Sequence, residues 1–306
     1  MSYQRLTVFQ CANVDLDEGF AAYQREDYAT AVEQWRLLAE QGDATAQCNL
    51  GMMYQCGQGV PQDFKEAVAW YRKAAEQGRA DAQYKLGEMC ANGSDEGDKE
   101  AVTWYGRAAE QGHADAQFNL GFMYNIGRGV AQDFNKAMMW YGKAVEQGNT
   151  QAQILLGALH ACGHGVKQDD TEAVNCFREA AEMGDAGAQH LIGAMIQGGK
   201  GLPQDDAEAV TWYLRAAEQG LAEAQHRLGG MYAYGHGVPK NRVAAYALYS
   251  LSAANRYYED TQDSMDELTS SMSEQEIENG RALMQEMALP GNLGCALDEY
   301  FKKNLD

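Results

Sequence analysis

His160, Cys162 and His164 have the residue types and spacing of metal ligands. Histidines four residues apart share one face of a helix, and a cysteine thiolate between them would supply a third ligand. A closed zinc site needs about four ligands, and the sequence offers no fourth close by. We therefore expect no metal at this segment.

Glycine pairs of the form Gly-x-Gly occur at five places, and such pairs can cradle phosphate groups. A phosphate-binding loop follows a strand, opens a helix and carries Lys-Ser or Lys-Thr. These pairs follow helical segments and lack that dipeptide. The chain also has no Gly-x-Ser-x-Gly motif and no segment that concentrates Ser, His and Asp. The sequence therefore predicts a protein that is not an enzyme and holds no cofactor.

The net charge of the chain limits the classes of partner that it is expected to bind. The 306 residues carry a formal net charge of −20, from 24 Lys and Arg against 44 Asp and Glu. Nucleic acids and anionic membranes attract basic surfaces, so this charge argues against both. The sequence shows no secretion signal, no stretch of the roughly 18 apolar residues that a membrane span needs, and no disulfide framework among its seven scattered cysteines. We therefore expect a cytoplasmic protein.

Internal repetition explains most of the 33 glycines. A Leu-Gly or Ile-Gly pair recurs with spacings of 36, 34, 36, 36 and 36 residues. An Ala-Gln pair stands just before each of them, a triplet resembling Glu-Gln-Gly comes earlier, and a Gly-x-Gly turn follows five of them. These motifs contain 22 of the 33 glycines. A period of this length indicates a repeat architecture.

Each period is expected to form two antiparallel helices. In the first copy Gly57 ends the first helix, Asp63 caps the second, and Gly78 closes it. The missing Cβ of Gly51 lets a neighbouring helix approach closely. One hairpin cannot bury its apolar face, so stacked copies should form a solenoid. The shorter loop at Asn92–Gly97 predicts a local change in the second copy.

The repeated pattern A-Q-x-x-L-G-x-x-Y-x-x-G-x-G-V-x-x-D, followed by A-x-x-W-Y-x-x-A-A-E-Q-G, resembles the Sel-one-like repeat (SLR) of the tetratricopeptide-like superfamily. The resemblance spans about Asp27 to Ala254. It implies a right-handed α-superhelix that serves as an adaptor or scaffold, often in bacterial signalling, secretion or host interaction. Some secreted members bridge two cysteines in each hairpin. Here Cys48 and Cys56 lie about 12 Å apart along one predicted helix, too far for a disulfide, which favours a reduced, intracellular protein.

The expected fold is therefore an all-α, right-handed α-solenoid of antiparallel hairpins with a period of about 36 residues and a helical C-terminal cap. Residues 1–14 are expected to form an N-terminal extension, 15–42 a tetratricopeptide-like hairpin, and 256–306 the cap. The SLR array occupies 43–255, in copies 43–78, 79–112, 113–148, 149–184, 185–220 and 221–255.

Aligned copies separate packing positions from variable ones. Cys90 and Cys176 stand where other copies have Tyr and Trp, so both are expected to be buried packing residues. The middle residue of the Gly-x-Gly turn, which includes Arg128 and His164, varies between copies and is expected to be exposed and undemanding.

In tetratricopeptide-like stacks the first helix of each hairpin lines a concave groove. The resemblance places three variable positions of each first helix on that groove, and variation on a constant scaffold suits recognition. Tyr84, Phe118 and Phe122 are the favoured anchors, since aromatics dominate interface hot spots. His190 and His226 would add polar, pH-sensitive contacts. The predicted protein-binding residues are Met52, Gln55, Tyr84, Glu88, Phe118, Phe122, Asn125, Ile154, His190, His226 and Tyr234.

We therefore expect a non-enzymatic scaffold or adaptor that binds a partner protein in the groove. The acidic charge favours a partner with a basic surface. One alternative is a dedicated inhibitor, immunity protein or regulator of a single effector enzyme. Another is a hydrolase acting on cell-wall-type compounds, against which the lack of a nucleophile–base pair counts. It also stays open whether the variable positions differ only because nothing selects them.

Overall fold

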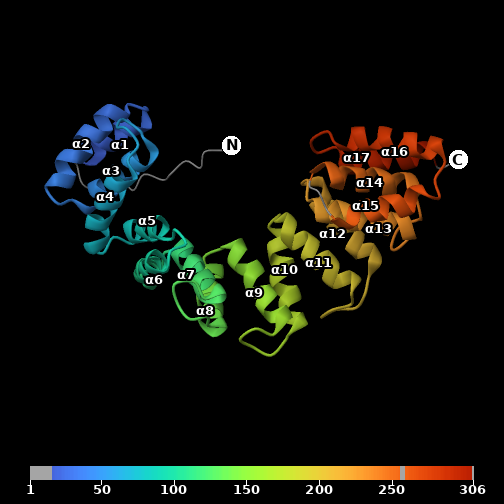
Figure 1. Ribbon diagram of the computed structural model, residues 1–306, viewed down its shortest axis with the longest axis horizontal. Helices are drawn as coiled ribbons and strands as arrows, with labels where there is room; N and C mark the ends of the chain where they lie inside the picture. The colour runs from blue at the N-terminus through green and yellow to red at the C-terminus, as the bar shows by residue number, and fades with distance from the viewer. Residues whose placement is uncertain (1–15, 256–258, 305–306) are drawn as a thin grey trace. The chain divides into compact units, whose positions relative to one another are not determined.

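The computed structural model describes residues 16–255 and 259–304. Every regular element in these residues is an α-helix, and the chain divides into two compact units, one ending at Asn149 and the other beginning at Thr150 (Figure 1). Within each unit, consecutive helices pack as antiparallel hairpins, and the hairpins stack on one another.

The first unit contains α1 (Leu16–Gln24), α2 (Tyr28–Glu40), α3 (Ala44–Cys56), α4 (Phe64–Glu76), α5 (Ala80–Cys90), α6 (Asp95–Glu110), α7 (Ala114–Ile126) and α8 (Phe134–Val145). The second unit contains α9 (Thr150–Cys162), α10 (Asp170–Glu182), α11 (Ala186–Gln197), α12 (Asp206–Glu218), α13 (Ala222–Tyr234), α14 (Arg242–Asn255), α15 (Glu259–Thr269), α16 (Glu274–Met287) and α17 (Leu293–Lys303).

The glycine of each Leu-Gly pair allows the two helices of a hairpin to close. A Cβ atom built on Gly51 of α3 would lie 2.8 Å from the ring of Tyr71 on α4. The same distance separates a Cβ on Gly121 of α7 from the ring of Tyr141 on α8, and Gly193 repeats the contact in the second unit. Real Cβ atoms do not approach rings this closely, so the predicted close approach is confirmed and its partner is a buried aromatic ring.

The second glycine of a Gly-x-Gly turn lies against the preceding hairpin at Gly59, Gly129, Gly201 and Gly237. Gly59 has φ +70°, and a Cβ there would lie 2.3 Å from the carbonyl oxygen of Tyr28 at the start of α2. Gly129 has φ +67°, and its Cβ would lie 2.4 Å from the carbonyl oxygen of Asp98 on α6. The turn therefore needs glycine twice over, for its left-handed backbone and for the close approach to a neighbouring helix.

The glutamine of five of the six Ala-Gln pairs joins three helices within its unit. Gln83 of α5 is buried, its Nε2 donates to the carbonyl oxygen of Ala75 on α4 (3.0 Å), and its Oε1 accepts from Nε2 of Gln111 (2.7 Å) at the end of α6. The same two bonds recur at Gln47, Gln117, Gln189 and Gln225, with Asn255 as the donor in the last case. This ladder explains why Ala-Gln and Glu-Gln-Gly recur together, because a buried amide must find partners for both its ends.

The short loop of the second copy is held by an ion pair. Ser94 caps α6, and the buried Asp98 receives two hydrogen bonds from Arg128, at 2.7 Å from Nε and 2.8 Å from Nη2. Asp98 also accepts from the backbone N–H of Gly93 (3.2 Å). The predicted local change is therefore present. The expectation that the middle turn residue is undemanding is wrong for Arg128, because this side chain bridges two repeats.

This ion pair predicts a pH-dependent contribution to stability. The Arg128 guanidinium lowers the pKa of the Asp98 carboxyl from its ordinary value of 3.8, so the pair favours the folded state above that pH and is lost as the pH falls through the folded-state pKa. Arg128→Gln, which places the Gln58 side chain of the first copy at this turn, should lower the urea midpoint at about pH 7, and the difference should shrink as the pH falls through the folded-state pKa of Asp98. Urea titrations at several pH values measure this. A midpoint difference that is the same at every pH would rule out the ion pair as its cause.

Helices α16 and α17 cover the last hairpin of the second unit. Helix α16 begins with a capping box, in which Ser273 and Glu276 each accept from the other's backbone N–H. Phe301 of α17 stacks on Tyr232 of α13, with ring centroids 5.5 Å apart. The apolar side chains of the two helices that become buried are Leu283, Met287, Leu293, Ala296 and Leu297.

Candidate interaction site

The predicted protein-binding residues of the first unit differ in accessibility. Met52 is only 3 % exposed, and every residue of α3 from Thr45 to Met53 is buried. The prediction of an accessible side chain is therefore wrong for Met52. Gln55 is half-buried, and its Oε1 accepts from the Tyr71 hydroxyl (2.7 Å). This hydrogen bond joins α3 to α4, so the Gln55 side chain stabilises its own hairpin. Asn125, the equivalent residue of α7, is also half-buried.

In the second unit the predicted residues are mostly engaged within the fold. Ile154 is half-buried against the core, and the ring of His190 lies 5.7 Å from that of Tyr213. The Nδ1 atom of His226 lies 3.1 Å from the hydroxyl of Thr261 on α15. Tyr234 is 59 % exposed. It aligns with Ile126 of the first unit, one position after the repeat position that Gln55 and Asn125 occupy.

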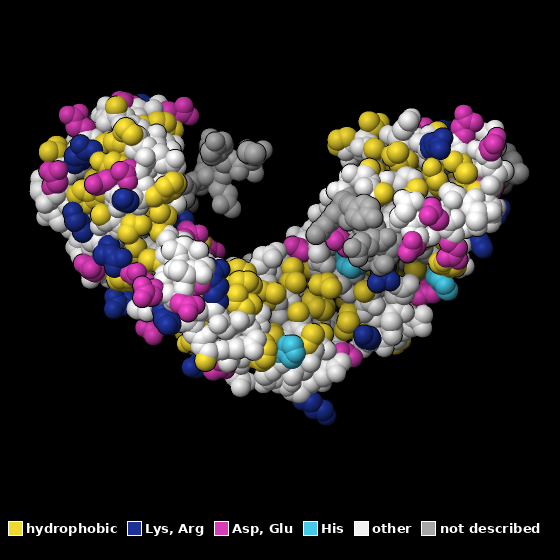
Figure 2. Space-filling model, in the orientation of Figure 1, with side chains coloured by type: hydrophobic (Ala, Val, Ile, Leu, Met, Phe, Trp, Pro, Cys, Tyr) yellow, Lys and Arg dark blue, Asp and Glu magenta, His cyan; other side chains and the backbone are white. Residues whose placement is uncertain are grey.

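Apolar side chains form an accessible stripe on α7. Phe118, Phe122 and Ile126 follow one another at four-residue intervals, so they lie on one side of the helix. Phe118 is half-buried with its ring 6.0 Å from that of Tyr141, whereas Phe122 is 38 % and Ile126 is 47 % exposed. Exposed hydrophobic side chains are visible among charged ones on the face of each unit seen in Figure 2.

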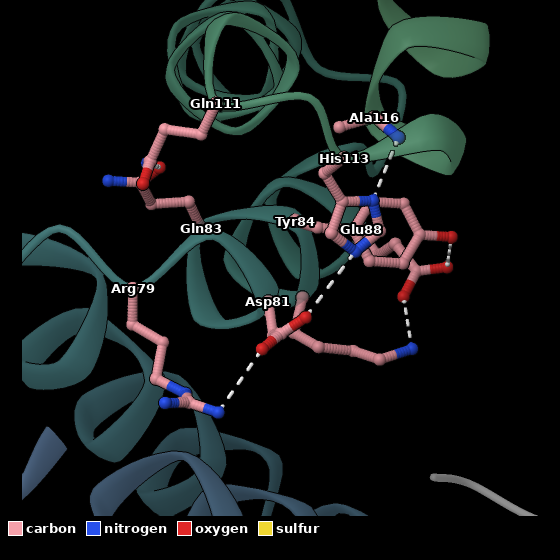
Figure 3. A network of polar contacts seen from close by, with 9 residues as sticks. Arg79, Asp81, Gln83, Tyr84, Glu88, Gln111, His113 and Ala116 are labelled. Atoms are coloured by element: carbon pink, nitrogen blue, oxygen red, sulfur yellow. Dashed lines mark hydrogen bonds and ion pairs between the residues drawn. The ribbon is translucent and has the colours of Figure 1, made fainter. Parts of the chain in front are cut away.

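A polar network lies beside this stripe, where α5 meets the start of α7 (Figure 3). The ring of Tyr84 stacks on that of His113, with centroids 4.5 Å apart, and its hydroxyl donates to Oε1 of Glu88 (2.9 Å). Lys85 forms an ion pair with the other oxygen of Glu88 (2.7 Å). The residues Tyr84, Glu88, Phe118, Phe122 and Ile126 together are called the α5–α7 face below.

His113 is the N-cap of α7. Its Nδ1 accepts from the backbone N–H of Ala116 (3.3 Å), and its Nε2 lies 3.8 Å from Oδ1 of Asp81, whose other oxygen lies 3.3 Å from Nη2 of Arg79. Burial lowers the pKa of the imidazole from its ordinary 6.5, although the carboxylate of Asp81 acts in the opposite direction. The neutral ring with its proton on Nε2 satisfies both contacts.

The residues that suggested metal or thiol chemistry can be compared with the sequence prediction. The described residues contain no group of three or more His, Cys, Asp or Glu side chains that could hold a metal ion. Cys90 and Cys176 are buried as predicted, and burial raises the pKa of each thiol to about 11. Thiols with such pKa values are overwhelmingly protonated at neutral pH and are poor nucleophiles.

Two residues of this region, Ile126 and His113, are not among the residues predicted from the sequence. Ile126 follows Phe122 by one turn of helix, and its exposure could have been found by extending the register of the α7 stripe. His113 stands where other copies have Asp43 or Asp185, both of which cap helices. That alignment was the available signal for its role.

The stacked hairpins, repeated turns and glutamine ladder define an α-solenoid repeat protein. A family model described as the Sel1 repeat matches residues 44–78, 80–113, 114–149, 150–185, 186–221 and 222–257. The chain therefore belongs to the Sel1 repeat family, as its resemblance to the Sel-one-like repeat predicts.

Two solved structures are similar along most of the chain. One is c5321, a protective antigen present in uropathogenic Escherichia coli strains that displays an SLR fold; it is 30 % identical with a TM-score of 0.80, and the match covers 95 % of this chain and 64 % of that one. The other is a Sel1 repeat protein from Oxalobacter formigenes, 33 % identical with a TM-score of 0.68, covering 78 % of this chain and 97 % of that one. Comparison with curated proteins returned no match. Among the described residues, no helix combines the length and apolar character needed to cross a membrane.

Proposed function

We propose that this chain is a non-enzymatic scaffold that binds a partner protein on the α5–α7 face of its first unit. The observation that carries the proposal is the exposure of Phe122 and Ile126 on a helix whose opposite side is anchored in the core by Leu120 and Met123. Rigid, exposed apolar side chains lose little conformational entropy on binding and exclude water well. Members of the Sel1 repeat family generally take part in protein–protein interactions, which agrees with this role.

The surroundings of the stripe suggest the chemistry of the partner. Asp81, Glu88 and Asp115 of α5 and α7 outnumber Arg79 and Lys85, with which two of them pair, and the whole chain carries a net charge of −20. A partner that presents apolar side chains flanked by Lys or Arg would match both features. Complementary charge of this kind chiefly raises the association rate, so binding should weaken as salt concentration rises.

The test replaces the exposed stripe and leaves the core intact. Phe122→Glu with Ile126→Glu puts two carboxylates where apolar contact is expected, and binding of a partner captured by the wild-type chain should weaken by at least about tenfold. Leu37→Glu and Met139→Glu are matched controls, because these residues are 54 % and 48 % exposed on the second helices α2 and α8. Affinities are measured by calorimetry with the purified partner. If the double variant binds as tightly as the two controls, the α5–α7 face is not the binding site.

A further inference from the structure

The cap of α7 differs chemically from the equivalent caps of α3 and α11. Those helices are capped by Asp43 and Asp185, whose carboxylates accept from the backbone N–H three residues later at 2.8 Å. At α7 the acceptor is the imidazole Nδ1 of His113. A carboxylate keeps its acceptor oxygens down to about pH 4, whereas an imidazole loses its acceptor when it gains a proton near neutral pH.

We propose that His113 is a pH-sensitive cap, which holds the first turn of α7 and the α5–α7 face at neutral pH and releases them when its Nδ1 is protonated. Nδ1 can either accept the hydrogen bond from the Ala116 N–H or carry a proton, but it cannot do both at once. A protonated Nδ1 would point its hydrogen at the N–H of Ala116, and the resulting cation would stand at the positive end of the helix dipole.

The charged groups around the ring set the direction of the response. Asp81 and Glu88 of α5 and Asp115 of α7 favour the cation, while Lys85 and burial oppose it, and burial has the largest effect. The pKa of His113 is consequently lower in the folded protein than in the unfolded chain. Because the unfolded chain takes up the proton more readily, the stability contributed by the cap is present above about pH 6.5 and is lost as the pH falls through the folded-state pKa.

Contacts link the cap to the proposed binding surface. The ring of His113 stacks on Tyr84, whose hydroxyl is tied to Glu88, so rotation of the imidazole removes one side of the support for Tyr84. The first turn of α7 leads directly to Phe118, whose ring packs near Tyr141. Loss of the cap therefore alters both edges of the α5–α7 face. This regulatory part of the inference rests on the proposed function, whereas the cap itself does not.

The cap is tested in the full chain without any partner. Hydrogen exchange at the Ala116 N–H, corrected for the intrinsic pH dependence of exchange, should lose protection by about 2- to 25-fold between about pH 7.5 and pH 5, which is the effect of losing an N-cap. The Ala188 N–H, capped by Asp185, is an internal control that should keep its protection. In His113→Asp the response at Ala116 should disappear, because an aspartate does not titrate in this range.

Two results would overturn the proposal. One is protection at Ala116 that stays constant with pH in the wild-type chain, as at Ala188. The other is a nitrogen spectrum at about pH 7.5 that shows the proton of His113 on Nδ1, since that tautomer cannot accept from Ala116. Partner affinity at both pH values, compared with His113→Asp, tests the regulatory part separately. If neither the wild-type chain nor His113→Asp binds a partner at the α5–α7 face, the proposed function fails. The exchange result still shows whether His113 is a pH-sensitive cap.

Discussion

Replacing Tyr141 with alanine is expected to destabilise the first unit by about 3–5 kcal/mol, as for other large aromatic residues in protein cores. The side chain is fully buried on α8, and its ring covers the backbone of Gly121 on α7. Gly121→Ala alone should cost about 1–3 kcal/mol, because its Cβ would lie 2.8 Å from that ring. In the double variant the added methyl enters the space that the ring has left. Its destabilisation should therefore be smaller than the sum of the two single effects.

Gly142→Ala is the matched control for this cycle. Gly142 also lies within α8, but a Cβ there would meet no other atom within 4 Å. Alanine should therefore stabilise the helix by about 0.5–1 kcal/mol through its higher helix propensity. Urea unfolding followed by circular dichroism measures all four variants. If the effects of Gly121→Ala and Tyr141→Ala simply add, the ring is not the reason that glycine occupies position 121.

Gly129→Ala should destabilise the first unit by about 2–5 kcal/mol. Alanine in a left-handed backbone conformation costs about 1–2 kcal/mol, and crowding against a neighbouring element typically adds about 1–3 kcal/mol. Both apply here, since φ is +67° and the Cβ would lie 2.4 Å from the carbonyl group of Asp98. The backbone of another helix cannot move aside as the end of a flexible side chain can. The loss should appear in the urea midpoint and as faster hydrogen exchange at the start of α6.

Gly112→Ala separates the two contributions. Its φ of +91° is also left-handed, but a Cβ there would meet nothing within 4 Å. Only the conformational cost of about 1–2 kcal/mol is expected for this variant. Equal destabilisation by Gly112→Ala and Gly129→Ala would contradict the inference that the turn is a contact between repeats.

Much of the architecture could be predicted because it depends on local, repeated patterns. The positions of Asp63, Gly57 and Ser273 predict helix ends through interactions within a few residues, and the structure has these caps. Repetition added a further constraint, because the same residues at the same spacing must make the same contacts. That constraint also revealed that Cys90 and Cys176 occupy packing positions.

The candidate site was less predictable, because exposure depends on which neighbouring elements cover a residue. Met52 and Phe122 occupy equivalent positions in their copies, yet Met52 is buried and Phe122 is 38 % exposed. Arg128 and Gln58 share a turn position, but the turn of Arg128 lies against Asp98, which supplies an acidic partner, whereas the turn of Gln58 lies against Tyr28. Alignment of copies shows which positions are equivalent, but it does not show what surrounds each one.

The sequence by itself determined the helical class, the period, the helix ends and the Sel1 repeat family, because these follow from short-range chemistry repeated along the chain. Only the tertiary structure decided the contacts between residues about thirty apart, such as Gln83 with Gln111 and Asp98 with Arg128. It also decided that His113 is a cap stacked on Tyr84. Such contacts depend on how hairpins rest on one another, and that packing brings side chains together to within a fraction of an ångström in a way that spacing along the chain does not record.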